Sequence, residues 1–582
     1  MLQHNQLRVK ISMAPLAFII LGALHFLLFV GKLHSQANST PKTPKPKLGI
    51  IPKGIPPAKN QFGYKFIDTT ILASHLKFLA SDLMEGRETG KRGQKLAARY
   101  IAAHFERLGL KPIGDNGTYF QHFWVKERRV GQNNTMLIER RSLSGNSSEN
   151  ITTFLHDFVF FPSRAFNPPP SISGKVVFAG FGISDAKTYR YDDFAGQNLE
   201  GKIVMIMTGE PQQNDSSSRF DGAKPTQWSD SRYKYLAASA AKASAVLIVT
   251  ELGSDTTSLF DTFKEYHDYI SQSSMELTDA PDKGTAKGTK TATPPLYFIS
   301  KKTANALLAE SQKKIETLYE TIEKSAAPAS FEIPNTKLTL TIDLQEGFLQ
   351  SENVCGFLEG SDPKLKNEAV ILTSHYDHVG MTYEGTVFNG ADDDGSGTST
   401  ILTLAEAFAK NPIRSKRSMI FMTVSGEEKG LLGSKYYTDN PKFPLTSTYA
   451  NINMDMVGRV DSTKYEKIGV SDYIYVIGSD KISKDLDDAL IRQNTESVNL
   501  KLDYTYNDEN DPNRFYYRSD HYNFAKNGIP IVFFFDGLHA DYHKTTDDVE
   551  KIHFPRMAKV AKLAFSLGWE LANRREPLRQ ND

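Results

Sequence analysis

The stretch "NGADDDGSG", residues Asn389–Gly397, places three consecutive aspartates between glycines. Adjacent carboxylates repel one another, so such a run is either left in water or gathered around a cation. A calcium loop is one alternative, but the position that requires a bidentate glutamate in such a loop is Thr403. A solvated acidic turn is another alternative, and the triplet alone does not decide between these interpretations.

The segments around this run alternate between apolar strands and helices. From Thr336 onward the chain reads as "AVILTSHYDH", a helix from Ser396 to Lys410, "SMIFMTVSGEE", a helix from Gly430, "YANINMDMVG", "YIYVIGS", a helix around 485–494, "IPIVFFFDG" and a final helix from Phe554. Near-continuous apolar strands joined through helices predict an α/β fold with a mixed, largely parallel sheet sandwiched by helices. Ligands of such sheets bind beyond the carboxyl ends of the strands.

Acidic and imidazole side chains stand where these strands end. They are His375 and Asp377 after "AVILTS", Glu427 and Glu428 after "SMIFMTVSG", Asp455 within "NINMDMVG", and His539 and His543 after "IPIVFFF". Each has an ordinary explanation alone, such as a hydrogen-bonded histidine or a charged helix start. Together with the aspartate run they indicate a metal site, because this set can supply the two histidines and three carboxylates, one of them bridging, that suit two zinc ions with an open position each.

In order and spacing, "SHYDHVG", "NGADDDGSG", "SGEEKGLLGS", "NMDMVGR" and "YHKTTDD" resemble the motifs of the co-catalytic zinc aminopeptidase family, which includes glutamate carboxypeptidases, glutaminyl cyclases and the transferrin receptor. The resemblance runs from about Phe66 to the C-terminus and implies the zinc exopeptidase fold. It also implies a zinc metallopeptidase, an aminopeptidase that hydrolyses N-terminal residues of peptides through a metal-bound water.

The resemblance also implies a role for each matching residue. The middle aspartate, Asp393, would bridge two zinc ions, and the Asp393–Asp394 peptide would be cis. One ion would take Asp393, Glu428 and His543, and the other would take Asp393, Asp455 and His375. Asp377 would orient the His375 imidazole, and Glu427 would be the general base.

A further stretch, "YYRSDHYNFAKNGIP", resembles a part of the family that lies near the substrate pocket. It makes His521 a candidate for contact with substrate, and a structural histidine is the alternative interpretation. A carboxypeptidase is the alternative activity, and it needs a cationic pocket for which Arg459, Arg514 and Arg518 are candidates. A non-catalytic receptor or scaffold on the same fold is the alternative from another class.

Composition limits the partners. The chain has 582 residues, of which 40% are hydrophobic, so we expect two or three globular units. Lys plus Arg (69) almost balances Asp plus Glu (68), which provides no overall field for binding nucleic acid. Peptide substrates are the expected partners, and the oligomeric state is left open. The single cysteine, Cys355, excludes an intrachain disulfide and a cysteine-built zinc site.

The predicted organisation has five parts. They are a signal peptide (1–37), a Pro/Lys-rich linker (38–61), the N-terminal part of the peptidase domain (62–153), an insertion that resembles a protease-associated domain (154–334), and the catalytic domain (335–582). The resemblance of the insertion rests on "DDFAGQNLEGKIVMIMTGEP" and an alanine-rich helix. Arg8 and Lys10, the apolar run 14–30 and a cleavage site after Ala37 predict a secreted or periplasmic protein, with an uncleaved membrane anchor as the alternative.

Overall fold

The structure is a computed structural model that describes residues 57–581, apart from 132, 142–146, 161–168, 214, 223, 254–256, 264–272, 282–292 and 383–384. The predicted signal peptide and most of the predicted linker lie outside these residues. Chain contacts divide the described part into two compact units. The larger unit comprises 57–128, 274–281 and 346–581, and the smaller unit comprises 129–273 and 293–345.

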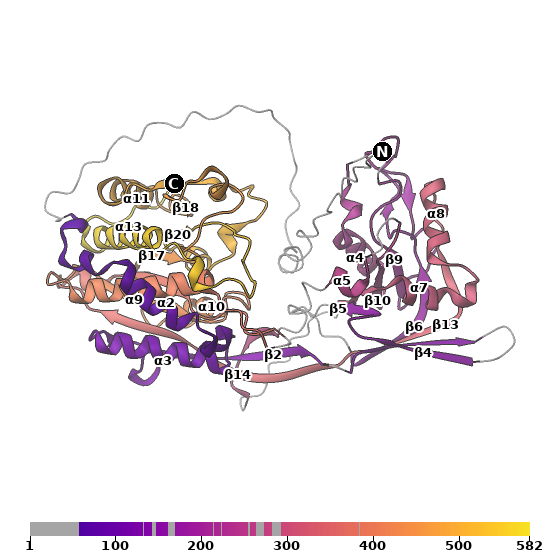
Figure 1. The fold of residues 1–582 in the computed structure, drawn as a ribbon, viewed down its shortest axis with the longest axis horizontal. Coiled ribbons are helices and arrows are strands. Elements are labelled where there is room, and N and C mark those ends of the chain that lie inside the picture. Colours follow the sequence, from indigo (N-terminus) through magenta and orange to yellow (C-terminus); the bar gives the residue numbers. More distant parts are fainter. Residues whose placement is uncertain are drawn as a thin grey trace, which may run out of the picture. The chain divides into compact units, whose positions relative to one another are not determined.

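A mixed sheet of ten strands, counted over the described residues, forms the centre of the larger unit (Figure 1). Its order is β11 (Ser274–Thr278), β2 (Phe120–Val130), β14 (Leu344–Leu358), β16 (Ser418–Val424), β15 (Ala369–His375), β17 (Thr448–Met454), β20 (Ile531–Phe535), β18 (Tyr473–Ile477) and β19 (Lys501–Asp503), with β1 (Lys111–Pro112) paired to β14. The central strands β16, β15, β17 and β20 are parallel to one another. Their carboxyl ends therefore lie along one edge.

The central strands are covered on both faces, as their apolar character predicts. Every residue of β15 and β16 is buried. Successive side chains point to opposite faces, and accordingly Val370 and Leu372 pack in one apolar cluster whereas Ala369 and Ile371 pack in another. The first cluster includes residues of the helices α2 (Thr69–Leu79), α3 (Arg92–Arg107), α9 (Gly397–Lys410), α11 (Lys484–Ser497) and α13 (Phe554–Asn573), and the second includes residues of α10 (Leu432–Asp439) and α12 (His521–Ala525). The predicted α/β sandwich is confirmed.

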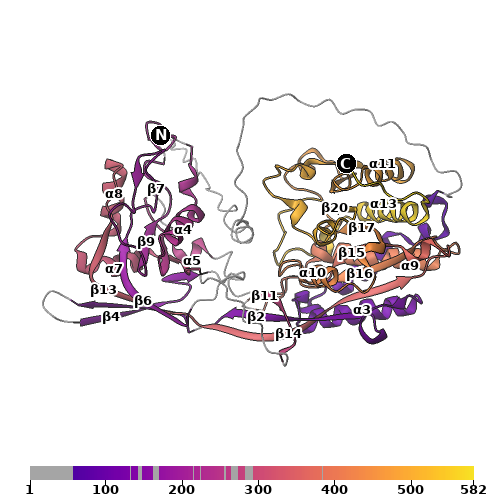
Figure 2. The ribbon, with the colours of Figure 1, turned by 180° about the vertical axis from the view of Figure 1, so that it is seen from behind.

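The helices of the larger unit are α2 (Thr69–Leu79), α3 (Arg92–Arg107), α9 (Gly397–Lys410), α10 (Leu432–Asp439), α11 (Lys484–Ser497), α12 (His521–Ala525) and α13 (Phe554–Asn573), and Figure 2 shows this unit from the opposite side. Of these, α9, α10, α11 and α13 begin close to the helices predicted from Ser396, from Gly430, around 485 and from Phe554. Local chemistry explains, for example, where α2 begins. The Asp68 carboxylate accepts hydrogen bonds from the backbone N–H groups of Thr70 and Ile71 and so caps the helix.

The smaller unit has its own sheet and its own apolar clusters. The sheet order is β4 (Ser147–Thr153), β3 (Thr135–Arg141), β13 (Phe331–Thr341), β6 (Ser171–Phe178), β9 (Ile203–Met207), β10 (Ala245–Val249), β12 (Leu296–Ile299) and β5 (Phe158–Phe160). Its helices are α4 (Ser231–Ala240), α5 (Leu259–Thr262), α7 (Lys301–Leu308) and α8 (Ile315–Ser325), and β7 (Ser184–Asp185) pairs with β8 (Tyr191–Asp192).

The smaller unit begins at Arg129 and ends at Gln345, beyond both ends of the expected insertion at 154–334. The reason is strand pairing: β3 and β4 precede residue 154, yet β3 forms its hydrogen bonds with β4 and β13. The assignment of the smaller unit to the protease-associated domains stays a prediction.

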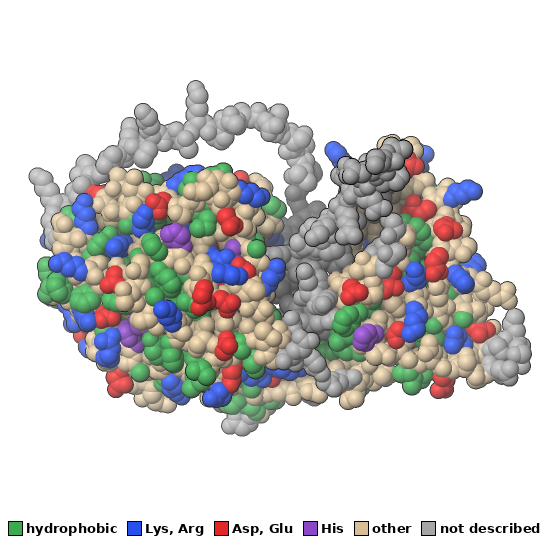
Figure 3. Space-filling view, in the orientation of Figure 1, with side chains coloured by type: hydrophobic (Ala, Val, Ile, Leu, Met, Phe, Trp, Pro, Cys, Tyr) green, Lys and Arg blue, Asp and Glu red, His purple; other side chains and the backbone are tan. Residues whose placement is uncertain are grey.

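Figure 3 shows acidic and basic side chains interspersed on the visible face of each unit. Among the helices of the described residues, none is long and apolar enough to cross a membrane.

Candidate metal centre

The edge where the parallel strands end carries the predicted ligands. His375 is the last residue of β15, Glu427 and Glu428 follow β16, Asp455 follows β17, His543 lies beyond β20, and Asp393 lies in the turn Ala391–Ser396 that leads into α9. The side chains of these residues are almost wholly buried except that of His543, which is 35% exposed. The structure therefore brings together residues that are far apart in the sequence.

Asp393 lies between two imidazoles. Its Oδ1 is 3.2 Å from His375 Nε2, and its Oδ2 is 2.9 Å from His543 Nε2. A second carboxylate accompanies each ring: Asp455 Oδ1 is 3.5 Å from His375 Nε2, and Glu428 Oε2 is 3.1 Å from His543 Nε2. The cluster thus consists of two groups, each with one imidazole and two carboxylates, that share Asp393.

The other two aspartates of the triplet face the backbone. Asp394 Oδ2 accepts the backbone N–H of His375 at 3.2 Å, and Asp392 Oδ1 accepts that of Gly458 at 2.7 Å. The peptide between Asp393 and Asp394 is cis, as the resemblance implies. Only the middle aspartate of the triplet directs its carboxylate at the imidazoles of His375 and His543, while its neighbours bond to backbone N–H groups of the surrounding loops.

The cluster has donor atoms that suit zinc, and two of its imidazole nitrogens lack a well-formed hydrogen bond. The Nε2 atoms of His375 and His543 are buried without a hydrogen bond of acceptable geometry. Burial alone would lower the pKa of His543, but the Glu428 and Asp393 carboxylates raise it to about 10. Several carboxylates crowded around imidazole nitrogens attract a cation, and this nitrogen and oxygen donor set suits zinc.

Asp377 and Glu427 are held next to this cluster. The Asp377 carboxylate accepts hydrogen bonds from the Thr89 hydroxyl at 2.7 Å and from the Glu427 backbone N–H at 3.3 Å. The Nδ1 of His375 is 3.1 Å from the Asp377 carbonyl oxygen and 3.8 Å from its carboxylate. Asp377 therefore contacts both the imidazole and the segment that carries Glu427, and its main-chain oxygen is the nearer partner of the ring.

His378 also belongs to this site, and the sequence analysis did not single it out. It is buried, and its Nδ1 is 2.8 Å from Glu428 Oε1. His378 is part of "SHYDHVG", but it follows the end of β15, so the alternation of a strand does not predict where it points. His539, named from the sequence without a role, places Nε2 3.2 Å from Asp392 Oδ2, behind the cluster.

Arg87 is a buried cation beside the site, in the polar segment "EGRETGKRG" (85–93). The sequence pattern did not indicate a role for it. It is 1% exposed, and its guanidinium donates to the carbonyl oxygens of Leu79 (2.6 Å), Tyr376 (2.9 Å), Asn389 (2.8 Å) and Gly390 (2.9 Å). It thereby ties the loop after β15 to the loop that precedes the aspartate triplet. We assign Arg87 a positioning role, because these hydrogen bonds hold the backbone directly after His375 and shortly before Asp393.

Replacement of Arg87 with methionine should destabilise the larger unit by about 3 kcal/mol or more, because several buried carbonyl oxygens lose their donor. Chemical denaturation measures this change. The matched control is Arg92→Ala, since the side chain of Arg92 is 70% exposed and forms a surface ion pair with Glu85, and its effect should stay near zero. Similar stabilities for the two variants would contradict the positioning role of Arg87.

A pocket opens beside the cluster. Its lining combines acidic residues of the site with apolar side chains and one arginine: Asp393, Glu427, Asp455, Met456, Phe515, Arg518, Ser519, Phe533, Phe535, Leu538 and Tyr542. Of the arginines considered for a carboxylate pocket, Arg518 lines this pocket, whereas Arg459 forms an ion pair with Asp541 at 2.8 Å. The pocket therefore offers an apolar surface next to the carboxylates.

His521 is placed behind this lining. It is fully buried, its ring stacks on Phe533 at 4.6 Å, and its Nε2 is 2.8 Å from the carbonyl oxygen of Tyr516. Burial lowers its pKa to about 3, so the ring is neutral. His521 is not one of the described residues that line the pocket. Its contact with substrate stays a prediction.

Comparison with known proteins identifies relatives of this part of the chain. Residues 353–567 match the profile described as "Peptidase family M28". Leucine aminopeptidase 1 of Penicillium rubens is 30% identical over 224 residues, which cover 36% of this chain and 54% of that protein. Aminopeptidase YwaD of Bacillus subtilis is 36% identical over 118 residues, 20% of this chain and 23% of that protein. The matched part thus spans about half the length of the first relative.

The fold also matches a solved structure. The aminopeptidase from Aneurinibacillus sp. strain AM-1 aligns over 89% of this chain and 97% of its own, with a TM-score of 0.53 and 19% sequence identity. At that identity the match concerns the fold. It agrees with the mixed sheet and helical layers described above.

Proposed function

Since residues 353–567 belong to peptidase family M28, we propose that the protein is a zinc-dependent aminopeptidase that removes N-terminal residues from peptides. The observation that carries the proposal is that Asp393 lies between two imidazoles, each accompanied by a second carboxylate. The pocket beside this cluster is lined by Asp393 and Glu427. The names of the similar proteins, leucine aminopeptidase and aminopeptidase, support the direction of cleavage.

The proposed centre holds two zinc ions. One group of ligands is Asp393, Glu428 and His543, and the other is Asp393, Asp455 and His375. When bound, zinc polarises a carbonyl oxygen and makes water a better nucleophile. Neighbouring contacts orient the ligands: the Ser519 hydroxyl donates to Asp455 Oδ2 at 2.7 Å, and the Asp377 carbonyl oxygen lies against His375.

Glu427 is the proposed general base. Glu427 lines the pocket, and its Oε2 lies 3.9 Å from His375 Nε2, which is too far for a strong hydrogen bond to that ring. The carboxylate is therefore available to take a proton from the attacking water and to pass it to the leaving amine. Because Asp377 holds the Glu427 backbone N–H, the glutamate is positioned by a residue that also contacts His375.

The pocket lining supports a preference for an apolar N-terminal side chain. Phe515, Phe533, Phe535, Leu538 and Met456 form the apolar part of the lining, and burial of a leucine or phenylalanine side chain there is favourable by about 1.5–3 kcal/mol. Leucyl and phenylalanyl amides should therefore show a higher kcat/KM than glutamyl and lysyl amides.

The requirement for a free α-amine tests the direction of cleavage. Beside the carboxylates, the amine would set the first peptide bond over the reacting groups, so that binding energy is converted into position. Aminoacyl amides and short peptides should be cleaved, and their N-acetylated counterparts should lose kcat as well as affinity at saturating zinc. Release of the C-terminal residue from the capped set would favour the carboxypeptidase alternative, which Arg518 in the pocket lining supports.

Export from the cytoplasm is part of the same proposal. The apolar run 14–30 and the small residues that precede a cleavage site after Ala37 support a signal peptide. N-terminal sequencing of the mature protein distinguishes a chain that begins at Asn38 from one that keeps a membrane anchor. A purified protein that holds no zinc and has no peptidase activity would instead favour the receptor or scaffold alternative.

A further inference from the structure

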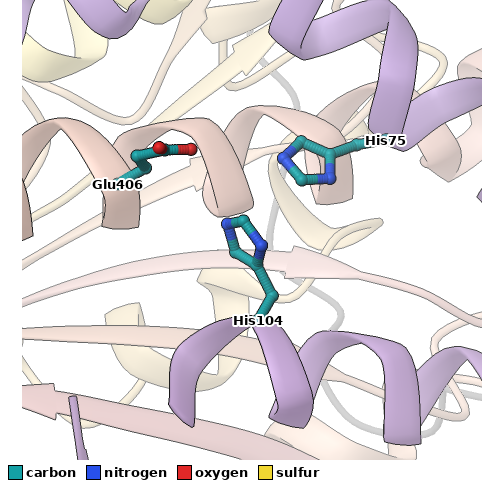
Figure 4. A group of neighbouring side chains, drawn as sticks. All are labelled: His75, His104 and Glu406. Atoms are coloured by element: carbon teal, nitrogen blue, oxygen red, sulfur yellow. The ribbon is translucent and has the colours of Figure 1, made fainter. Parts of the chain in front are cut away.

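A second group of potential ligands lies among the helices of the larger unit and shares no residue with the candidate metal centre (Figure 4). It consists of His75 on α2, His104 on α3 and Glu406 on α9. Both α2 and α3 pack against α9. Each of the three side chains offers one ligand atom, and these atoms lie within 4.8 Å of one another.

Both imidazoles are buried, and the Nε2 of each lacks a well-formed hydrogen bond, although the Leu402 carbonyl oxygen lies close to the His104 ring. His75 is 5% exposed and His104 is 8% exposed. The Nδ1 of His75 is 2.8 Å from the Tyr100 hydroxyl, but neither Nε2 has a hydrogen bond of acceptable geometry. Figure 4 shows both rings directed toward the space beside the Glu406 carboxylate. A buried nitrogen left unpaired is costly, and a bound ligand would remove that cost.

The rings are neutral and can therefore offer a lone pair. Burial, together with the neighbouring His104 ring and the positive charge of Arg107, lowers the pKa of His75 to about 3. Burial, together with the positive charges of Arg107 and Lys410, lowers the pKa of His104 to about 4, against the opposing effects of Glu406 and the Leu402 carbonyl oxygen. Neutral imidazole is the form that ligates metals. The hydroxyl of Tyr100 on His75 Nδ1 is the kind of outer contact that fixes the orientation of a ligating ring.

Two basic side chains compete for the same groups. Lys410 forms an ion pair with Glu406, and Arg107 lies 3.5 Å from Glu406 Oε2 and 3.3 Å from His104 Nδ1. As a donor, Arg107 leaves the His104 proton on Nε2, so a metal at Nε2 requires that proton to move to Nδ1. Arg107 can leave this position, because its side chain is 56% exposed.

We propose that His75, His104 and Glu406 form a second metal site, the helix-face site, that binds one divalent transition-metal ion such as zinc. Two imidazoles and one carboxylate are a zinc ligand set that leaves a fourth position for water. Ligand atoms of a tetrahedral zinc ion are about 3.4 Å apart, so binding would draw the three side chains together by roughly 1 Å. The ion would connect α2, α3 and α9 and so stabilise the helical layer on that face of the sheet.

The direct test is anomalous scattering at the zinc edge from crystals of the full chain grown with zinc. A peak about 2.0–2.2 Å from His75 Nε2, His104 Nε2 and a Glu406 oxygen is expected. The peak should vanish in His104→Gln and in Glu406→Gln, and it should persist in His122→Gln, which alters a histidine that pairs with Asp115 elsewhere. Absence of the peak in the wild type, or a peak indifferent to Glu406→Gln, would overturn the proposal.

A solution test separates this site from the proposed catalytic centre. In an Asp393→Ala background, titration with zinc should still raise the unfolding temperature, because an ion that binds only the folded state stabilises it. Adding His104→Gln should abolish this rise. Adding Arg107→Gln should tighten binding by about tenfold, since a competing unit charge a few ångströms away is removed. A rise that survives His104→Gln would refute the helix-face site and leave the peptidase proposal untouched.

Discussion

Glutamine in place of Glu427 should lower kcat by about 10²- to 10⁴-fold, the usual contribution of a general base. Glutamine has the same shape but cannot take a proton from water. Because Glu427 is assigned no metal, the variant should keep the zinc content and the unfolding temperature of the wild type. Steady-state kinetics on a leucyl amide, with metal analysis of the same sample, measures both quantities.

The matched control for this experiment is Glu106→Gln on the exposed side of α3, which should leave kcat unchanged. If Glu427→Gln kept substantial activity, the role of the base would pass to another group. If it lost zinc along with activity, Glu427 would be a ligand, and the division of roles between the two adjacent glutamates would have to be reversed.

Alanine in place of Asp393 should abolish binding of both proposed zinc ions, whereas Asp455→Ala and His543→Ala should each weaken mainly one. The reason is geometric: the two oxygens of Asp393 face different imidazoles, at 3.2 Å and 2.9 Å. Metal content after dialysis against a weak chelator, measured for each variant, provides the comparison. The loss of activity in Asp393→Ala should be close to complete.

Asp392→Asn is the control within the same triplet. Its Oδ1 accepts a backbone N–H, a role that an amide oxygen can keep, so zinc content should stay near that of the wild type. Equal zinc losses in Asp393→Ala, Asp455→Ala and His543→Ala would contradict the bridging assignment. Circular dichroism of each variant confirms that metal loss is not caused by unfolding.

The elements around the triplet could be predicted because their patterns are local. Runs such as "AVILT" and "SMIFMTV" are apolar at most positions, as expected for a sheet buried on both faces, and β15 and β16 are buried throughout. The rule that ligands bind at the carboxyl ends of parallel strands then groups His375 with Asp455. Which aspartate of the triplet faces inward needed the family resemblance, since all three are alike in the sequence.

Other features depend on pairings that no local pattern contains. Arg87 lies in a polar link, and what makes it important are carbonyl oxygens some 300 positions away. The start of the smaller unit at Arg129 depends on the pairing of β3 with β13, about 200 residues later. His521 was connected with substrate by resemblance alone, and the structure places it behind Phe533. Long-range packing decides each of these cases.

The spread of the proposed ligands along the chain has a consequence for biosynthesis. His375 leaves the ribosome well before its counterpart His543, which follows β20, the strand that pairs with β17. A nascent or truncated chain that stops before β20 therefore holds only part of the ligand set. Such a chain lacks His543, so the proposed group of Asp393, Glu428 and His543 can be completed only after translation has passed β20, and a prematurely terminated product would lack a complete two-metal centre.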